Sequence, residues 1–179
     1  MDTIQFCNAI LYCLKTHGHG DDLFNGTHLA YAAWLINIYY FLKYHESALS
    51  PDSLNDFEVG YYGPYNQTIN ETFDSVYKDH PAYVKNSLQE QFLFQDNNGF
   101  DVKVVPFEYD LIPLKVRQII ESHALQIWQA DNFHLSQVFQ QEPQMLHTQN
   151  HFQNSTYSFT QSVDYFKNHI QAITKRKSY

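Results

Sequence analysis

The strongest constraint on the fold of this chain is a segment that is apolar on nearly every side of a helix. Apolar residues recur at helical spacing after Thr27 and as far as about His45, on two faces: Leu29, Ala33, Ile36 and Tyr40 on one, and Tyr31, Leu35, Ile38 and Leu42 on the other. A helix that is apolar nearly all round is usually buried, so this segment is the predicted central helix. Its longest apolar run, residues 30–42, is interrupted by Asn37 and is too short to span a bilayer.

The rest of the chain is expected to be helical around this core. With 179 residues, one domain covering residues 1–179 is long enough to bury a substantial core. A first helix is expected from about Thr3 to Lys15, and further helices at residues 66–78, 81–91, 113–130, 135–141 and 161–175. Residues 50–53 are expected to form a turn, and Pro143 is expected to stop the helix before it.

A small hairpin is the expected exception to helix. Residues 96–99 (DNNG) form a strong turn signal, and the alternating residues 100–104 read as a strand whose partner is the segment 91–94. The predicted fold class is therefore mainly α: a compact multi-helix domain around a buried central helix, with a small β-hairpin.

The sharpest local signal is the segment 57–65, FEVGYYGPY, which begins at Phe57. An extended piece is expected to break at Gly63 and Pro64, because glycine tolerates positive φ and proline disfavours helix in the residue before it. The joint would direct the chain into a helix that opens at Asn66. Its role is interpreted as chiefly architectural.

The tyrosines beside this joint are the candidate binding residues. Tyrosine offers a large contact area with a polar tip and is enriched at interfaces. For Tyr61 and Tyr65 two readings stay open, partner contact or filling of a groove beside the central helix, whereas Tyr62 is expected in the core. Asn66 is included in the predicted contact site. Glu58 is expected to be an anchoring carboxylate that accepts hydrogen bonds, with general acid or base chemistry as the alternative.

The charge balance favours a basic protein as partner. The chain has 19 acidic residues against 11 Lys and Arg, for a net charge of −8. Nucleic-acid affinity depends on cationic contacts to phosphate, so no nucleic-acid partner is expected. An acidic chain is suited to meeting a basic protein. Cys7 and Cys13 lie in an apolar helical pattern and are expected to be buried thiols, and with no signal peptide at the start a cytoplasmic location is expected.

Catalytic and metal chemistry find little support in the sequence. His17, His19, Asp21 and Asp22 form the densest group of possible metal ligands, and His147 and His151 have helical spacing. Two glycines loosen the first loop, and the sequence contains no G-x-S-x-G, P-loop or G-x-G-x-x-G pattern. No metal, cofactor or enzymatic activity is expected.

Three blocks of the chain resemble the Panacea-domain family of SocA-like, phage-associated proteins. Segment 57–65 resembles the family's F-E-A-W-K-Y-G-P-V, segment 35–40 its L-x-K-L-L-Y helix, and segment 135–145 its L-S-x-L-T-H-x-E-P-x-W block. The chain departs from these patterns at Asn37, Gly60, Tyr61, Gln140 and Met145, as a divergent member would.

The resemblance implies an α-helical antitoxin that neutralises a cognate protein toxin by direct binding; one branch of the family resembles an adaptor that delivers its toxin to a protease. A phage or mobile-element inhibitor of a host defence protein is an alternative. A small metal-dependent enzyme using His17, His19 and Asp21 is a third hypothesis.

Overall fold

The computed structural model describes residues 1–14, 16–17, 25–74, 92–97, 102–106, 109–148 and 155–174. Its α-helices in this part of the chain are α1 (Thr3–Leu14), α2 (Gly26–Tyr44), α3 (Pro51–Asn55), α4 (Gln67–Ile69), α7 (Leu114–Gln129), α8 (Asn132–Gln140), α9 (Pro143–Thr148) and α10 (Phe159–Phe166). A π-helical turn (Asn70–Asp74) extends α4, and 3₁₀ turns lie at Tyr109–Leu111 and Ile170–Ile173. The strands form two antiparallel pairs, β1 (Phe57–Val59) with β2 (Pro64–Asn66) and β3 (Phe92–Asn97) with β4 (Val102–Pro106). The predicted mainly α class is confirmed.

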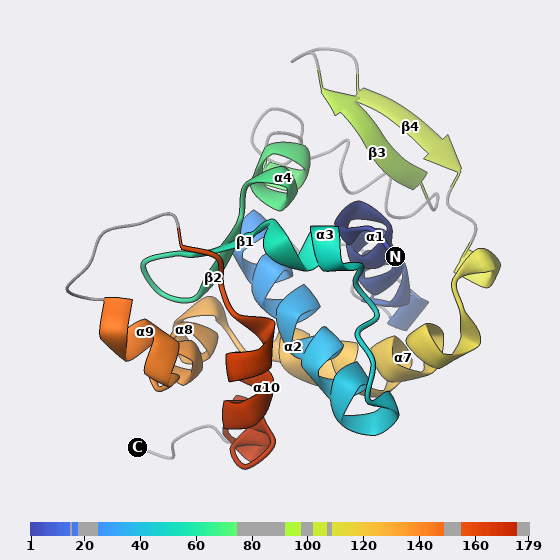
Figure 1. The fold of residues 1–179 in the computed structure, drawn as a ribbon. Coiled ribbons are helices and arrows are strands. Elements are labelled where there is room, and N and C mark those ends of the chain that lie inside the picture. Colours follow the sequence, from blue (N-terminus) through green and yellow to red (C-terminus); the bar gives the residue numbers. More distant parts are fainter. Residues whose placement is uncertain are drawn as a thin grey trace.

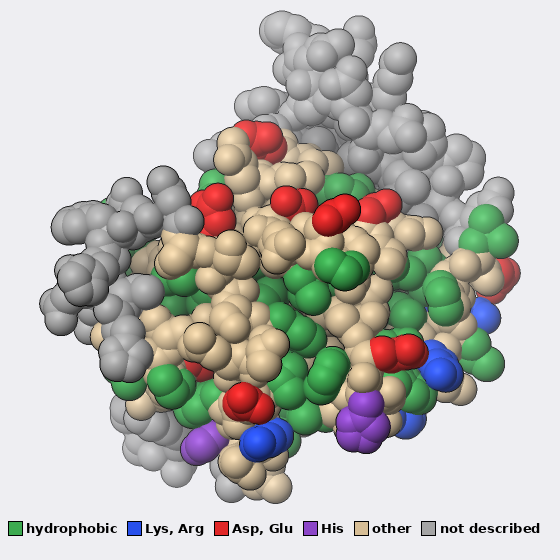
Figure 2. Space-filling model, in the orientation of Figure 1, with side chains coloured by type: hydrophobic (Ala, Val, Ile, Leu, Met, Phe, Trp, Pro, Cys, Tyr) green, Lys and Arg blue, Asp and Glu red, His purple; other side chains and the backbone are tan. Residues whose placement is uncertain are grey.

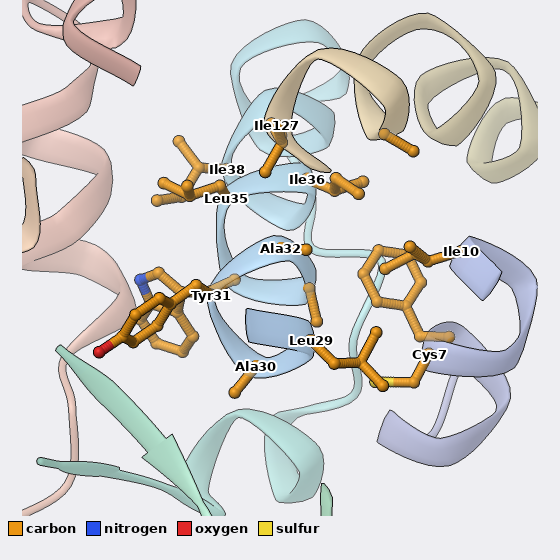
Figure 3. Close-up of a cluster of buried hydrophobic side chains, with 14 of the residues drawn as sticks. Cys7, Ile10, Leu29, Ala30, Tyr31, Ala32, Leu35, Ile36, Ile38 and Ile127 are labelled. Atoms are coloured by element: carbon orange, nitrogen blue, oxygen red, sulfur yellow. The ribbon is translucent and has the colours of Figure 1, made fainter. Parts of the chain in front are cut away.

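Helix α2 lies at the centre of the fold, as its all-round apolar pattern predicts. The other helices surround it in Figure 1, with α1 and α7 beside it and α10 alongside its other flank. Figure 3 shows Cys7 and Ile10 of α1 facing Leu29 of α2. Ile127 of α7 lies close to the α2 side chains in the same view. Burial of this whole surface is the main source of stability for a helix of this kind.

Asn37, in the middle of α2, is fully buried, and its side-chain amide is hydrogen-bonded. Asn37 accepts a hydrogen bond at Oδ1 from the backbone N of Ala48 (2.8 Å) and donates from Nδ2 to Ser47 Oγ (3.0 Å). Its amide therefore fixes the turn that follows the helix. A buried polar group is tolerated because it is hydrogen-bonded in this way.

Capping residues set the ends of α2. Asn25 accepts a hydrogen bond from His28 N at 2.8 Å, which places the helix start slightly before the expected position after Thr27. His45 ends the helix in the left-handed conformation with φ 59°. No helix among the described residues is long and apolar enough to cross a membrane.

Several predicted boundaries are wrong for local reasons. The turn expected at residues 50–53 is the start of α3, since Ser50 caps that helix and Pro51 occupies its first position. Pro143 also begins a helix, α9, in addition to following α8. The single helix expected at residues 161–175 is α10 followed by a separate 3₁₀ turn.

The β-structure is larger than predicted. The expected hairpin is present as β3 and β4, with its DNNG turn partly outside the described residues. The β1–β2 hairpin is not expected from the sequence, in which residues 64–66 read as the joint and the opening of a helix. Of the helix expected at 66–78, the structure describes α4 and the π turn, and the helix expected at 81–91 lies outside the described residues.

Candidate partner-binding site

The β1–β2 hairpin sorts its side chains onto an inner and an outer face. Cross-strand partners are Phe57 with Asn66, Glu58 with Tyr65, and Val59 with Pro64. Phe57, Pro64 and Asn66 are buried, whereas Glu58 and Tyr65 are on the other face and at least partly exposed. This alternation follows from the two-residue period of a strand.

Strand β1 is held on both edges. On the side away from β2, Val59 N donates to Ser155 O (2.9 Å) and Tyr157 N donates to Phe57 O (2.7 Å). Residues from near the C-terminal end thus add a bridge opposite Glu58, at Thr156. The hairpin is therefore anchored to a segment about a hundred residues later in the sequence.

Gly63 fixes the position of the hairpin loop against the core. A Cβ at this position would lie 2.9 Å from a ring atom of Tyr31 and 2.9 Å from a ring atom of Phe139. Gly60 N donates to Gly63 O at 2.9 Å and closes the loop. The glycine is required by this close approach, in agreement with an architectural role for the Gly63–Pro64 joint.

The β1–β2 hairpin presents its tyrosines to solvent. Tyr61 is 81% exposed, Tyr62 61% and Tyr65 37%. The expectation that Tyr62 lies in the core is wrong. Beneath the loop, the rings of Tyr31 and Phe139 pack against each other and approach Gly63, the residue next to Tyr62.

Asn66, which the sequence placed in the contact site, is fully buried. Its Oδ1 accepts from Ile69 N at 3.0 Å and caps α4. The side chain therefore presents no surface to a partner in this structure, and its observed role is that of a helix cap. The sequence carries a signal for this role, because Asn is a preferred residue at the position just before a helix.

Glu58 also differs from its expected bracing role. Within the described part of the chain, its carboxylate accepts no hydrogen bond and forms no ion pair. It is partly exposed beside Tyr65. The bracing of the joint comes instead from the backbone hydrogen bonds of β1 and the packing of Gly63.

The stretch of sequence that contains the hairpin has acidic residues but no basic ones. Residues 44–77 contain no Lys or Arg, and their acidic residues are Glu46, Asp52, Asp56, Glu58, Glu71 and Asp74. Figure 2 shows acidic side chains spread over the face in view, with the Lys and Arg side chains near its lower and right-hand edges. A partner that meets the tyrosines from this side meets negative potential.

A buried polar network lies beneath the same region. Glu142, which is fully buried, accepts hydrogen bonds from the hydroxyls of Tyr157 and Ser162 and from Gln144 Nε2 (3.2 Å). Ser162 Oγ in turn accepts from Trp34 Nε1 at 3.0 Å. Burial raises the pKa of Glu142, and these hydrogen bonds oppose that rise.

The position of this network defines its role. Tyr157 and Ser162 are buried with Glu142, so the carboxylate cannot reach a substrate in solution. The network joins Gln144 of α9 and Ser162 of α10 to Trp34 of the central helix. In the sequence, Glu142 stands out only as a member of the 135–145 block. No local pattern predicts that its carboxylate accepts hydrogen bonds from Tyr157 and Ser162, which lie 15 and 20 residues away.

The cysteines are buried thiols, as predicted. Burial raises the pKa of Cys7, and burial with the nearby Glu121 carboxylate raises the pKa of Cys13 to about 11. Cys13 Sγ lies 3.7 Å from His17 Nδ1, but that nitrogen is 2.7 Å from the Cys13 carbonyl oxygen. Thiols with raised pKa values are poor nucleophiles.

Most residues of the alternative metal hypothesis fall outside the described part of the chain. His19, Asp21, Asp22 and His151 lie outside the described residues. Among the residues that the structure does describe, no group of three or more His, Cys, Asp and Glu is arranged to hold a metal.

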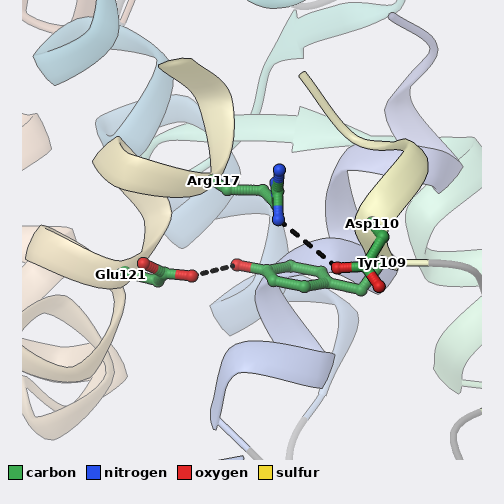
Figure 4. A network of polar contacts seen from close by, with 4 residues as sticks. All are labelled: Tyr109, Asp110, Arg117 and Glu121. Carbon is green, nitrogen blue, oxygen red and sulfur yellow. Dashed lines mark hydrogen bonds and ion pairs between the residues drawn. The ribbon is translucent and has the colours of Figure 1, made fainter. Parts of the chain in front are cut away.

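A second polar cluster ties the start of α7 to the preceding 3₁₀ turn. Figure 4 shows its members, Tyr109, Asp110, Arg117 and Glu121. Tyr109 donates to Glu121 Oε1 (3.0 Å), and Arg117 Nη1 lies 3.4 Å from Asp110 Oδ1. Burial, and then the hydrogen bond to Glu121, raise the pKa of Tyr109.

The fold and site together define a mainly helical protein that presents tyrosines on an anchored hairpin within an acidic surface. The chain matches no model of a protein family, and searches of curated proteins and of solved structures find no match either.

Proposed function

We propose that this protein is a cytoplasmic antitoxin that neutralises a cognate protein toxin by direct binding, with the tyrosine hairpin as its main contact. The observation that carries the proposal is the exposure of Tyr61 in the loop and Tyr65 in β2, on a hairpin whose first strand is hydrogen-bonded on both edges and whose Gly63 packs closely on Tyr31 and Phe139. Aromatic side chains of this kind dominate the energy of protein interfaces.

The anchoring of the hairpin favours tight binding. A partner-contact loop that is already ordered loses less conformational entropy on binding than a free loop. Here the ladder hydrogen bonds, the bridge at Thr156 and the packing of Gly63 order the loop before any partner arrives.

The acidic surroundings favour a basic toxin. Long-range attraction between a negative surface and a positive one raises the association rate and excludes acidic competitors. The same charge disfavours nucleic acid as partner. The antitoxin role rests on the resemblance of segments 35–40, 57–65 and 135–145 to Panacea-domain proteins, and Glu142 of the third block lies at the centre of the buried network.

Co-expression tests the proposal. The reading frame adjacent to the gene for this protein is induced alone and together with it, and growth is followed. The proposal expects the neighbour to arrest growth and this protein to restore it. Growth arrest that persists with this protein present at equal level contradicts the proposal.

Alanine variants locate the contact. The Y61A/Y65A double variant should lose neutralisation and should fail to retain the toxin in a pull-down. Phe133 is the matched control, because it is also an aromatic side chain, 67% exposed, but lies on α8. F133A should neutralise like the wild type.

A further inference from the structure

Glu58 and Tyr65 are direct neighbours on the exposed face of the β1–β2 hairpin. They are partners in the antiparallel register, so their Cβ atoms lie about 5 Å apart on the same side. Thr156, exposed on the bridging segment, continues the row on the far side of Glu58. The result is a carboxylate beside an aromatic ring on a surface open to solvent.

In the described part of the chain, two other tyrosines lie near a carboxylate and a cation that contacts both the ring and the carboxylate. Lys115 Nζ lies 5.0 Å from the ring centroid of Tyr44 and 3.7 Å from a carboxylate oxygen of Glu46. The ammonium group of Lys115 is therefore attracted both to a ring face and to a carboxylate.

The second example uses arginine. The guanidinium carbon of Arg117 lies 5.8 Å from the ring centroid of Tyr109, and its Nη1 lies 3.4 Å from Asp110 Oδ1. Figure 4 shows the guanidinium beside this ring and carboxylate. A planar guanidinium can stack on a ring and bind a carboxylate at the same time, which ammonium does less well.

The Glu58–Tyr65 pair differs from these two because no cation of the described chain occupies it. The ion pairs of the described residues do not include Glu58. The surrounding segment 44–77 supplies no Lys or Arg. The carboxylates and rings of the other two sites contact a Lys or Arg of this chain. The Glu58 carboxylate and the Tyr65 ring contact none from the described residues, so they are open to a cation from a partner.

We infer that Glu58 and Tyr65 form the recognition site for an arginine side chain on a basic segment of the protein partner. This inference rests on the proposed function for the identity of the partner. The Glu58 carboxylate accepts hydrogen bonds from the guanidinium, and the Tyr65 ring packs against its face. Tyr61, at the exposed tip of the same loop, supplies apolar contact to the neighbouring part of the segment.

Peptide binding tests the site without knowledge of the toxin. The full-length protein is titrated into fluorescein-labelled arginine-rich and lysine-rich peptides of equal length and charge, at low ionic strength, with fluorescence anisotropy as the readout. The arginine peptide should bind more tightly than the lysine peptide. Glu58→Gln and Tyr65→Leu should each weaken arginine-peptide binding about three- to tenfold, as expected for one partly exposed cationic contact.

Matched variants separate the site from overall charge. Asp164→Asn changes the net charge by the same amount as Glu58→Gln, but Asp164 is an exposed residue on α10. It should leave the affinity within about twofold of the wild type, as expected for a screened distant charge. Tyr65→Phe retains the ring and should bind like the wild type, and circular dichroism should show that all the variants are folded.

Two results would overturn the inference. Equal weakening by Glu58→Gln and Asp164→Asn would show that only net charge matters. Equal affinity for the two peptides, with no effect of Tyr65→Leu, would show that the ring is not used.

Co-expression with the neighbouring gene product distinguishes the two proposals. Neutralisation by wild type that is unchanged in Glu58→Gln contradicts the arginine site and leaves the antitoxin function standing. Failure of the wild type to neutralise, together with arginine-peptide binding that depends on Glu58 and Tyr65, contradicts the antitoxin function and leaves the site standing.

Discussion

The indole Nε1 of Trp34 donates a hydrogen bond to the hydroxyl oxygen of Ser162 across 3.0 Å, joining the middle of α2 to α10. The two residues are 128 positions apart in the sequence, and both are fully buried. Through Ser162 the indole is connected to Glu142, so one hydroxyl links the central helix to the buried carboxyl.

Replacing Ser162 with alanine should therefore destabilise the protein. The substitution removes the acceptor of Trp34 Nε1 and one donor to Glu142, and a buried polar group left unsatisfied costs about 1–3 kcal/mol. Urea unfolding followed by Trp fluorescence measures the loss. Ser122, exposed on α7, is the control: S122A should change the free energy of unfolding by less than about 0.5 kcal/mol.

The raised pKa of Glu142 predicts a specific pH dependence of stability. A carboxyl whose pKa is higher in the folded state binds its proton more tightly there, so it stabilises the fold below its unfolded pKa. That contribution is lost as pH rises from the ordinary glutamate value of 4.5 through the raised folded pKa. The free energy of unfolding of the wild type should fall over this range through Glu142.

Glu142→Gln isolates this contribution, because the amide carries no titrating proton. Its free energy of unfolding, minus that of the wild type, should increase from pH 4.5 upward in urea titrations. All other groups are common to the two proteins and cancel in the difference. A difference that is constant with pH would show that Glu142 has an ordinary pKa.

A methyl group at Gly63 should strain the hairpin loop. In Gly63→Ala the new Cβ would lie 2.9 Å from ring atoms of both Tyr31 and Phe139, and overpacking of this kind costs about 1–3 kcal/mol. Thermal unfolding measures the cost.

Shortening one of the two rings tests the cause of that strain. Phe139→Leu should be destabilising alone, yet the double variant with Gly63→Ala should cost less than the sum of the single variants, because they are in contact. Additive costs would place the strain in the backbone at Gly63 rather than in the contact.

Much of the helical architecture could be predicted because it depends on local periodicity. The apolar pattern of α2 and the recurring Val116, Ile119 and Ile120 of α7 mark buried faces whatever the rest of the chain does. The failures depend on contacts made far along the sequence. Strand β1 pairs with residues 155–157 as well as with β2, and the loop that exposes Tyr62 is held where Gly63 meets Tyr31 of α2 and Phe139 of α8.

Asn66 has two sequence contexts that favour different roles. Its position after exposed tyrosines favoured partner contact, whereas its position before α4 makes it a cap. Asn66→Ala should lower the free energy of unfolding by about 1 kcal/mol, the usual value of a cap. Asn66→Ser retains a capping oxygen and removes the amide nitrogen, which has no hydrogen-bond partner among the described residues, and should recover most of that loss.

The measurement that separates the two roles of Asn66 is neutralisation at a temperature where both variants are folded. A cap acts only through stability, so both variants should then neutralise fully. Loss of neutralisation in a folded Asn66→Ser protein would restore a contact role for this residue.

The bridge between β1 and residues 155–157 has a consequence for the order in which the hairpin is built during synthesis. The tyrosines at positions 61 and 65 leave the ribosome early, but the edge that holds their strand comes from near the end of the described chain. Because N-terminal segments are made first, a growing chain carries the tyrosines long before it can position them. Strand β1 is thus hydrogen-bonded on both edges only after residues 155–157 have been made, about a hundred residues after the strand itself.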